Sequence, residues 1–130
     1  MLAQRNPRIL VVDDNAFIRT CVAEVLRDEG YEVLEAPHGA AALSLVDESP
    51  PDLILLDMRM PVLDGWGFTR AYRERPGPHA PIVVMTAAQD AAQRAAQVRC
   101  ESYIAKPFDL DDLLDCVARF TGSGHGDRAA

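Results

Sequence analysis

Residues 9–14 read Ile-Leu-Val-Val-Asp-Asp, a short apolar run that ends on two acids. Three later runs have the same form: residues 53–57 read Leu-Ile-Leu-Leu-Asp, residues 82–86 read Ile-Val-Val-Met-Thr, and residues 103–106 read Tyr-Ile-Ala-Lys. Short runs rich in Val, Ile and Leu, separated by helical stretches, are typical of strands buried on both faces of a parallel sheet. The repeated pattern predicts an α/β fold in which polar side chains follow the buried strands.

Helical patterns separate these runs. We expect a first helix directly after the opening strand, capped by Asp14 or Asn15 and ended by Gly30. A short strand at residues 32–35 leads to a second helix, which ends at Ser49-Pro50-Pro51 because proline cannot continue a helix.

Three more helices are expected, at roughly residues 65–74, at roughly residues 90–98, and after Asp109 as the N-cap. Spacing places Cys21 and Cys116 on apolar helix faces, so both are interpreted as core thiols. The predicted buried faces contain Ile18, Cys21, Val22, Val25 and Leu26 in the first helix, Ala42, Leu43 and Val46 in the second, and Leu110, Leu113, Leu114, Val117 and Phe120 in the last.

Five strands alternating with five helices predict a doubly wound parallel sheet, most simply in the strand order 2-1-3-4-5. The switch point of that order lies between strands one and three, and Asp13, Asp14 and Asp57 flank it. We expect one domain over residues 8–120, followed by a disordered tail at 121–130 that contains three glycines and no apolar pattern.

Composition limits the classes of function. A chain of 130 residues, 48% of them hydrophobic, can form one domain with a substantial core. The net charge of −7 argues against binding to nucleic acid and favours a protein partner. The polar N-terminus does not resemble a signal peptide, and no apolar run has membrane-spanning length, so we expect a cytoplasmic protein that does not enter a membrane. The histidines and cysteines lack metal-ligand spacing.

The residues at the strand ends suggest one kind of chemistry. Three clustered carboxylates repel one another unless a cation is present, and Mg²⁺ typically binds one or two carboxylates together with water and phosphate oxygens. Aspartate is also a phosphoryl-accepting nucleophile. Conversion of one of these carboxylates into an acyl phosphate would add anionic charge, and Lys106, Thr86 and the metal are the groups able to take it up.

These motifs resemble the receiver domain of two-component response regulators, of the chemotaxis-regulator type. The resemblance covers residues 9–120 and is carried by Val-Val-Asp13-Asp14, Leu-Leu-Asp57-Met-Arg-Met-Pro, Val-Met-Thr86-Ala and Tyr103-Ile-Ala-Lys106-Pro-Phe. It implies a flavodoxin-like (βα)5 fold and a switch protein rather than an enzyme with a separate substrate. The resemblance further implies that Asp57 receives its phosphoryl group from a histidine kinase or a phosphotransfer protein.

By the same resemblance, Asp14 binds Mg²⁺ directly, Asp13 binds it largely through water, and Asp57 and the backbone carbonyl of Arg59 complete the protein ligands. Lys106 contacts the phosphoryl group, and Thr86 and Tyr103 form a switch pair. The face expected to change, and so to bind a downstream protein, consists of helix four, strand five and helix five.

Three alternatives stand beside a stand-alone receiver. The chain could be a receiver module of a larger hybrid kinase or transcription factor. An aspartyl-phosphate phosphohydrolase would need Asp-x-Asp after the first strand and a cap insertion, whereas this chain has adjacent aspartates and no length for a cap. A flavin mononucleotide carrier would need a Ser/Thr/Gly-rich loop where residues 15–18 read Asn-Ala-Phe-Ile.

Overall fold

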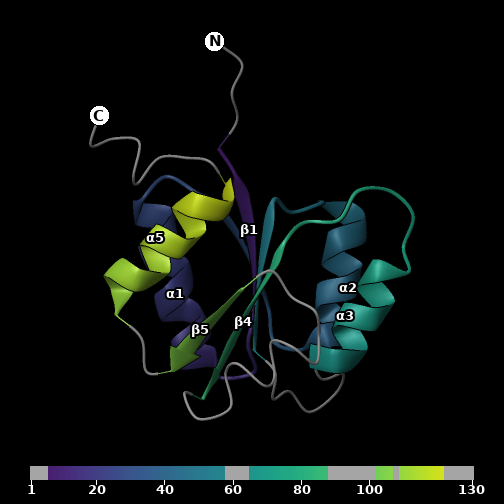
Figure 1. The fold of residues 1–130 in the computed structure, drawn as a ribbon, viewed down its shortest axis with the longest axis horizontal. Helices are drawn as coiled ribbons and strands as arrows, with labels where there is room; N and C mark the ends of the chain where they lie inside the picture. Colours follow the sequence, from purple (N-terminus) through teal and green to yellow (C-terminus); the bar gives the residue numbers. More distant parts are fainter. Residues whose placement is uncertain (1–5, 58–64, 88–101, 107–108, 122–130) are drawn as a thin grey trace.

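A computed structural model describes residues 6–57, 65–87, 102–106 and 109–121 of the chain, and all structural statements concern these residues (Figure 1). The strands are β1 (Arg8–Val12), β2 (Glu32–Ala36), β3 (Leu53–Asp57), β4 (Ile82–Ala87) and β5 (Ser102–Lys106), and the helices are α1 (Ala16–Asp28), α2 (Gly39–Glu48), α3 (Gly65–Arg73) and α5 (Leu110–Thr121). The helix expected at residues 90–98 and the tail after Thr121 lie outside the described residues.

The strands form one parallel sheet in the order β2-β1-β3-β4-β5, which confirms the predicted fold class and strand order. Val12 of β1 is paired with Leu56 of β3, so Asp13 and Asp57 come next at the same edge. Asp57 is paired in turn with Met85 of β4. The register therefore brings the predicted polar residues to a common edge.

The sheet lies between two helical layers. Helices α1 and α5 cover one face, and α2 and α3 cover the other (Figure 1). Alternate strand residues supply the two cores: Ile9 and Val11 of β1 pack with the α1 and α5 side, whereas Leu10 and Val12 pack with the α2 and α3 side. Because both faces are covered, the strands are almost continuously apolar, which explains the sequence pattern. None of the described helices is long and apolar enough to cross a membrane.

The ends of α1 follow the sequence prediction. The side chain of Asn15 accepts a hydrogen bond from the backbone N–H of Ile18 and caps the helix. At the other end Gly30 has a φ of 96°, its N–H donates to the carbonyl of Arg27, and the N–H of Tyr31 donates to the carbonyl of Leu26. This is a Schellman motif, in which the left-handed residue is ordinarily glycine. Helix α2 uses a cap that was not predicted, since Nδ1 of His38 accepts from the N–H of Ala41.

Two expected core residues are exposed. Cys21 is exposed. The buried side of α1 is centred on Val22, Ala23 and Leu26, and because successive residues are about 100° apart around the helix axis, Cys21 lies outside that side. Leu110 is 51% exposed. It shares a helical face with buried residues of α5, but it is the first residue of the helix and precedes the turn that packs on the sheet. Cys116, by contrast, is buried as predicted.

Candidate functional site

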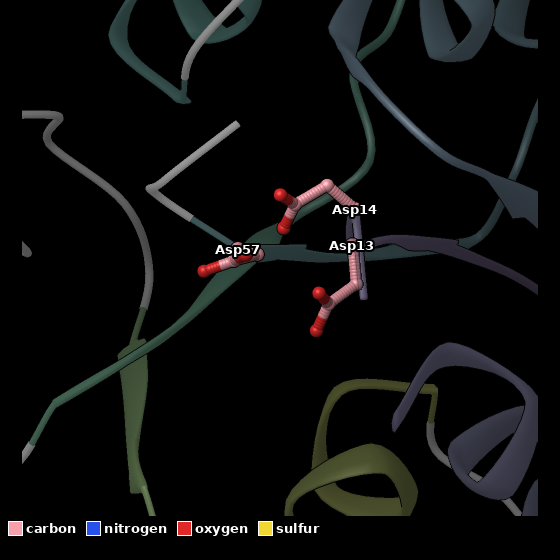
Figure 2. Close-up of side chains that lie close together, drawn as sticks. All are labelled: Asp13, Asp14 and Asp57. Carbon is pink, nitrogen blue, oxygen red and sulfur yellow. The ribbon is translucent and has the colours of Figure 1, made fainter. Parts of the chain in front are cut away.

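Three carboxylates meet where β1 and β3 end. Asp13 and Asp14 directly follow β1, and Asp57 is the last residue of β3. One carboxylate oxygen from each residue lies within 4.8 Å of those from the other two (Figure 2). Asp13 is 0% exposed and Asp57 is 6% exposed, whereas Asp14 is exposed. The cluster is therefore anchored in the sheet by two residues and open to water at the third.

Backbone hydrogen bonds hold the turn that carries the two adjacent acids. The N–H of Asp13 donates to the carbonyl of Ala36 at 3.1 Å, which extends the pairing of β1 with β2 by one residue. The N–H of Asn15 then donates to Oδ1 of Asp13 at 2.9 Å. Because Asn15 also caps α1, the start of the helix and the direction of the Asp13 carboxylate are fixed together.

The donor set fits a hard divalent cation. Mg²⁺ prefers oxygen ligands and loses its water reluctantly, so it is held by few carboxylates and keeps several waters. Asp13, Asp14 and Asp57 supply only carboxylate oxygens, and the exposure of Asp14 leaves an approach for water and for a phosphate group. No described histidine or cysteine joins this cluster, which disfavours a softer metal such as zinc.

The other predicted site residues are placed by the backbone alone. Thr86 lies in β4 and is paired with Ala105, and Lys106 closes β5 opposite Ala87. Tyr103 lies further back along β5, opposite Val84. The backbones of Thr86 and Lys106 thus reach the same edge of the sheet as Asp57, while Arg59 lies outside the described residues.

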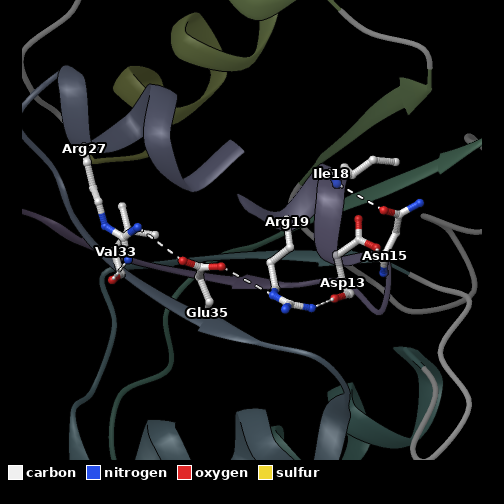
Figure 3. A network of polar contacts seen from close by, with 7 residues as sticks. All are labelled: Asp13, Asn15, Ile18, Arg19, Arg27, Val33 and Glu35. Carbon is white, nitrogen blue, oxygen red and sulfur yellow. Dashed lines mark hydrogen bonds and ion pairs between the residues drawn. The ribbon is translucent and has the colours of Figure 1, made fainter. Parts of the chain in front are cut away.

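One group beside the site was not predicted from the sequence. Nη1 of Arg19 in α1 donates to the backbone carbonyl of Asp13 at 2.9 Å, and Glu35 of β2 lies next to the same guanidinium (Figure 3). A charged residue on an amphipathic helix is ordinarily predicted to face solvent. The apolar spacing of α1 does not distinguish Arg19 from such a residue, so its contact could not be predicted from the sequence.

Comparison with known proteins gives consistent matches. Residues 9–118 match the family model of the response regulator receiver domain. Sporulation initiation phosphotransferase F of Bacillus subtilis (strain 168) is 35% identical over 117 residues, which are 88% of this chain and 94% of that protein. Transcriptional regulatory protein PdtaR of Mycobacterium tuberculosis is 39% identical over 113 residues, which are 85% of this chain but only 54% of the relative. The chain thus spans nearly all of one relative and about half of the other.

Solved structures agree with these sequence matches. The receiver domain of sensor histidine kinase PA1611 from Pseudomonas aeruginosa, solved with a magnesium ion coordinated in its active site cleft, has a TM-score of 0.82 and 35% identity, covering 91% of this chain and 99% of that one. Chemotaxis response regulator CheY4 of Vibrio cholerae has a TM-score of 0.80 and 32% identity, covering 88% of this chain and 98% of that one.

Proposed function

Since the chain belongs to the response regulator receiver family, whose members are phosphorylation-dependent switches of two-component systems, we propose that Asp57 is the residue that accepts the phosphoryl group. The observation that supports this assignment is the meeting of three carboxylates at the ends of β1 and β3. Open α/β sheets bind ligands at such a switch point. Asp57 belongs to the strand on the far side of that point from Asp13 and Asp14, and one of its carboxylate oxygens lies within 4.8 Å of an oxygen from each of them.

The transfer needs little covalent chemistry from the protein. A carboxylate oxygen of Asp57 forms a bond to phosphorus while the bond from phosphorus to the donor breaks, and the donor atom keeps that electron pair. Catalysis of this step is mostly positioning and neutralisation of charge, so no separate general base is required. Receiver domains obtain the phosphoryl group from histidine kinases or phosphotransfer proteins, and pass the signal to downstream targets.

Receiver domains bind Mg²⁺ at this position, and the acidic cluster of this chain fits it. We assign Asp14 as a direct ligand, Asp13 as a ligand largely through water, and Asp57 and the Arg59 carbonyl as the remaining protein ligands. When bound, Mg²⁺ would reduce the electrostatic repulsion of the carboxylates and the phosphoryl oxygens. The assignment of Asp13 is supported by its burial and by the hydrogen bond from Asn15 that fixes its carboxylate. The assignment of Asp14 is supported by its exposure, which lets a hydrated ion approach its carboxylate.

The proposed output begins at the neighbouring strands. Lys106 and Thr86 would contact the phosphoryl group, and Thr86 with Tyr103 would transmit its arrival to the face formed by the fourth helix, β5 and α5. The pairing of Thr86 with Ala105 supports this route, since a shift at the end of β4 acts directly on β5. A protein target on that face, in the cytoplasm, suits the acidic charge of the chain.

The relatives differ in length, which allows two settings for this switch: a receiver domain that makes up most of its protein, and one that is a module of a longer protein. The matched region makes up 94% of the Bacillus phosphotransferase, but only 14% of sensor histidine kinase GacS of Pseudomonas protegens. The proposed chemistry of Asp57 is the same in both settings, including assistance by the chain in its own phosphorylation and dephosphorylation.

The assignment of Asp57 can be tested by intact-mass measurement after incubation with acetyl phosphate and Mg²⁺. We expect a phosphorylated species in the wild-type protein, none in Asp57→Asn, and a strongly reduced amount in Asp14→Ala or after chelation of the metal. Asp28→Asn is the matched control, because Asp28 is an exposed acid at the far end of α1. Equal labelling of Asp57→Asn and the wild type would refute the assignment.

A further inference from the structure

A charged side chain holds the peptide group that joins the two adjacent acids of the site. Nη1 of Arg19 donates to the carbonyl oxygen of Asp13 at 2.9 Å. This carbonyl belongs to the same planar peptide group as the N–H of Asp14, so a hydrogen bond that fixes the orientation of the carbonyl also fixes that of the N–H. The side chain of Arg19 is only 17% exposed, which limits competition from water for this hydrogen bond.

The charge of Arg19 is balanced away from the carboxylate cluster. Its Nε lies 3.4 Å from Oε1 of Glu35, an ion-pair distance, yet this buried nitrogen makes no hydrogen bond. The attraction between the two side chains is therefore mainly Coulombic. Oε2 of Glu35 also lies 3.2 Å from Nη1 of Arg27, whose Nη2 donates to the carbonyl of Val33 (Figure 3). One carboxylate thus bridges two arginines of α1, one beside the site and one remote from it.

We infer that Arg19 is a positioning residue for the metal and phosphoryl site, and that it acts by fixing the Asp13–Asp14 peptide so that both carboxylates point into the cluster. The inference rests on the proposed function of that cluster. Within the described part of the site Arg19 contacts a backbone carbonyl and no carboxylate of the cluster, and Glu35 holds its guanidinium on the β2 side. Groups that orient metal ligands from outside the coordination shell commonly change metal affinity by about 10–100-fold when they are removed.

Arg27 provides a matched control within the same network. Like Arg19 it projects from α1, approaches Glu35 and donates to a backbone carbonyl, but that carbonyl belongs to Val33, the second residue of β2. Replacing either arginine with methionine keeps much of the aliphatic stem and removes the donors and the charge. A role limited to joining α1 to β2 predicts the same consequences for both variants, whereas a positioning role separates them.

The test is an NMR titration of the backbone amides with MgCl₂, without any phosphoryl donor, combined with thermal unfolding in metal-free buffer. We expect Arg19→Met to weaken Mg²⁺ binding by about tenfold, Arg27→Met to leave it unchanged, and both to lower the melting temperature. Arg19→Lys, which keeps the charge and one donor, should recover part of the affinity. Equal Mg²⁺ affinities for Arg19→Met and Arg27→Met would overturn the inference.

Asp14→Asn separates this inference from the proposed function. If Asp14→Asn leaves Mg²⁺ binding unchanged, the cluster is not the metal site and both proposals fail. If Asp14→Asn weakens binding and Arg19→Met does not, only the role of Arg19 is refuted. Should Arg19→Met not fold, Arg19→Gln serves in its place, because its shorter uncharged side chain lacks the guanidinium reach to the Asp13 carbonyl and should show the same loss.

Discussion

Asp13 and Asp14 are neighbours in sequence but lie in different surroundings. Asp13 has no exposed surface and accepts a hydrogen bond from the N–H of Asn15, whereas Asp14 is exposed. Both carboxylates nevertheless lie close to that of Asp57. At separations of 4–5 Å, two like charges repel by on the order of 1 kcal/mol in water and by more near a protein surface. The protein therefore gives up stability to keep these three acids together.

Removal of one charge from the cluster should stabilise the metal-free protein. We expect Asp14→Asn to raise the free energy of unfolding by about 1 kcal/mol in buffer with a chelator, because it relieves repulsion at an exposed position. The same variant should lose most of the stabilisation that Mg²⁺ gives to the wild type. Urea unfolding with and without Mg²⁺ measures both effects, and Asp28→Asn controls for the change in net charge. A destabilised Asp14→Asn protein without metal would contradict this account.

The described cysteines differ in burial, and their reactivity should differ accordingly. Cys21 is exposed, whereas Cys116 is 5% exposed and its burial raises the pKa of the thiol, against a smaller lowering by Arg119. Since the thiolate is the reactive form, a raised pKa and a buried sulfur both slow the reaction. In a Cys100→Ser background, a disulfide reagent should label Cys21 quickly and Cys116 only after unfolding. Peptide mapping identifies each labelled cysteine. Equally fast labelling of both in the native protein would show that the packing of α5 does not protect Cys116 from the reagent.

At the scale of helices and strands, the sequence predicts well wherever one local pattern decides the outcome. Apolar runs predicted the strands, Gly30 predicted the end of α1, and the cap of that helix is Asn15, one of its two candidates. The errors at Cys21 and Leu110 have another origin. Spacing shows which residues share a helical face, but the burial of a residue at the margin of that face, or in the first turn, depends on where the helix lies on the sheet.

Gly30 offers a direct test of the end of α1. Its φ of 96° is unfavourable for residues with a Cβ, and no heavy atom lies within 4 Å of the position that a Cβ would take. The cost of a substitution should therefore come from the backbone alone. We expect Gly30→Ala to lower the free energy of unfolding by about 1–2 kcal/mol, and Gly30→Asn by less, because asparagine tolerates the left-handed region. Denaturant unfolding of the two variants measures the difference, and an alanine variant as stable as the asparagine variant would argue against this conformation.

An ion pair at the surface joins α2 to the turn that follows α3. Nε and Nη2 of Arg75 donate to the two carboxylate oxygens of Asp47 at 2.8 and 3.0 Å. The hydrogen bond from Arg75, and also its charge, lower the pKa of Asp47 below the ordinary value of 3.8. A carboxyl whose pKa is lowered by folding stabilises the protein above its unfolded-state pKa and loses this contribution as the pH falls through the folded-state value.

Asp47→Asn should therefore have a small destabilising effect at neutral pH that fades below pH 3.8. Salt should also reduce the effect, because both side chains are partly exposed. Thermal unfolding of the wild type and the variant over a pH series measures the difference. The exposed neighbour Glu48, changed to glutamine, is the control. A difference between wild type and Asp47→Asn that grows toward low pH would have the wrong sign for this ion pair.

At the scale of the whole molecule, the parallel register is what turns separate motifs into one site. Val12 lies opposite Leu56, and Asp57 opposite Met85, so residues far apart in the chain reach one edge. This is why the cluster of Asp13, Asp14 and Asp57 could be predicted from the sequence. The contact of Arg19 with the Asp13 carbonyl could not, because it depends on the side-chain conformation of one arginine and on a partner in β2 that no local pattern connects to it.

The same register predicts which part of the sheet responds to a group on Asp57. Beyond Met85, the strand pair continues with Thr86 opposite Ala105 and Ala87 opposite Lys106, whereas β2 lies two strands away from β3 on the opposite side. A ligand shifts a conformational equilibrium only through its different affinity for the two states, and in the proposed function Thr86 and Lys106 supply that difference.

Hydrogen exchange of backbone amides, compared between the metal-free protein and its Mg²⁺-beryllofluoride form, tests this expectation; the fluoroberyllate stands in for the phosphoryl group. We expect the protection of Thr86, Ala87 and residues 102–106 to change by more than that of β2, because the proposed contacts of the added anion, Thr86 and Lys106, belong to β4 and β5. The Asp57→Asn protein is the control and should show no response. Equal changes in β2, or a response that survives in Asp57→Asn, would mean that the signal does not pass from Asp57 through β4 to β5.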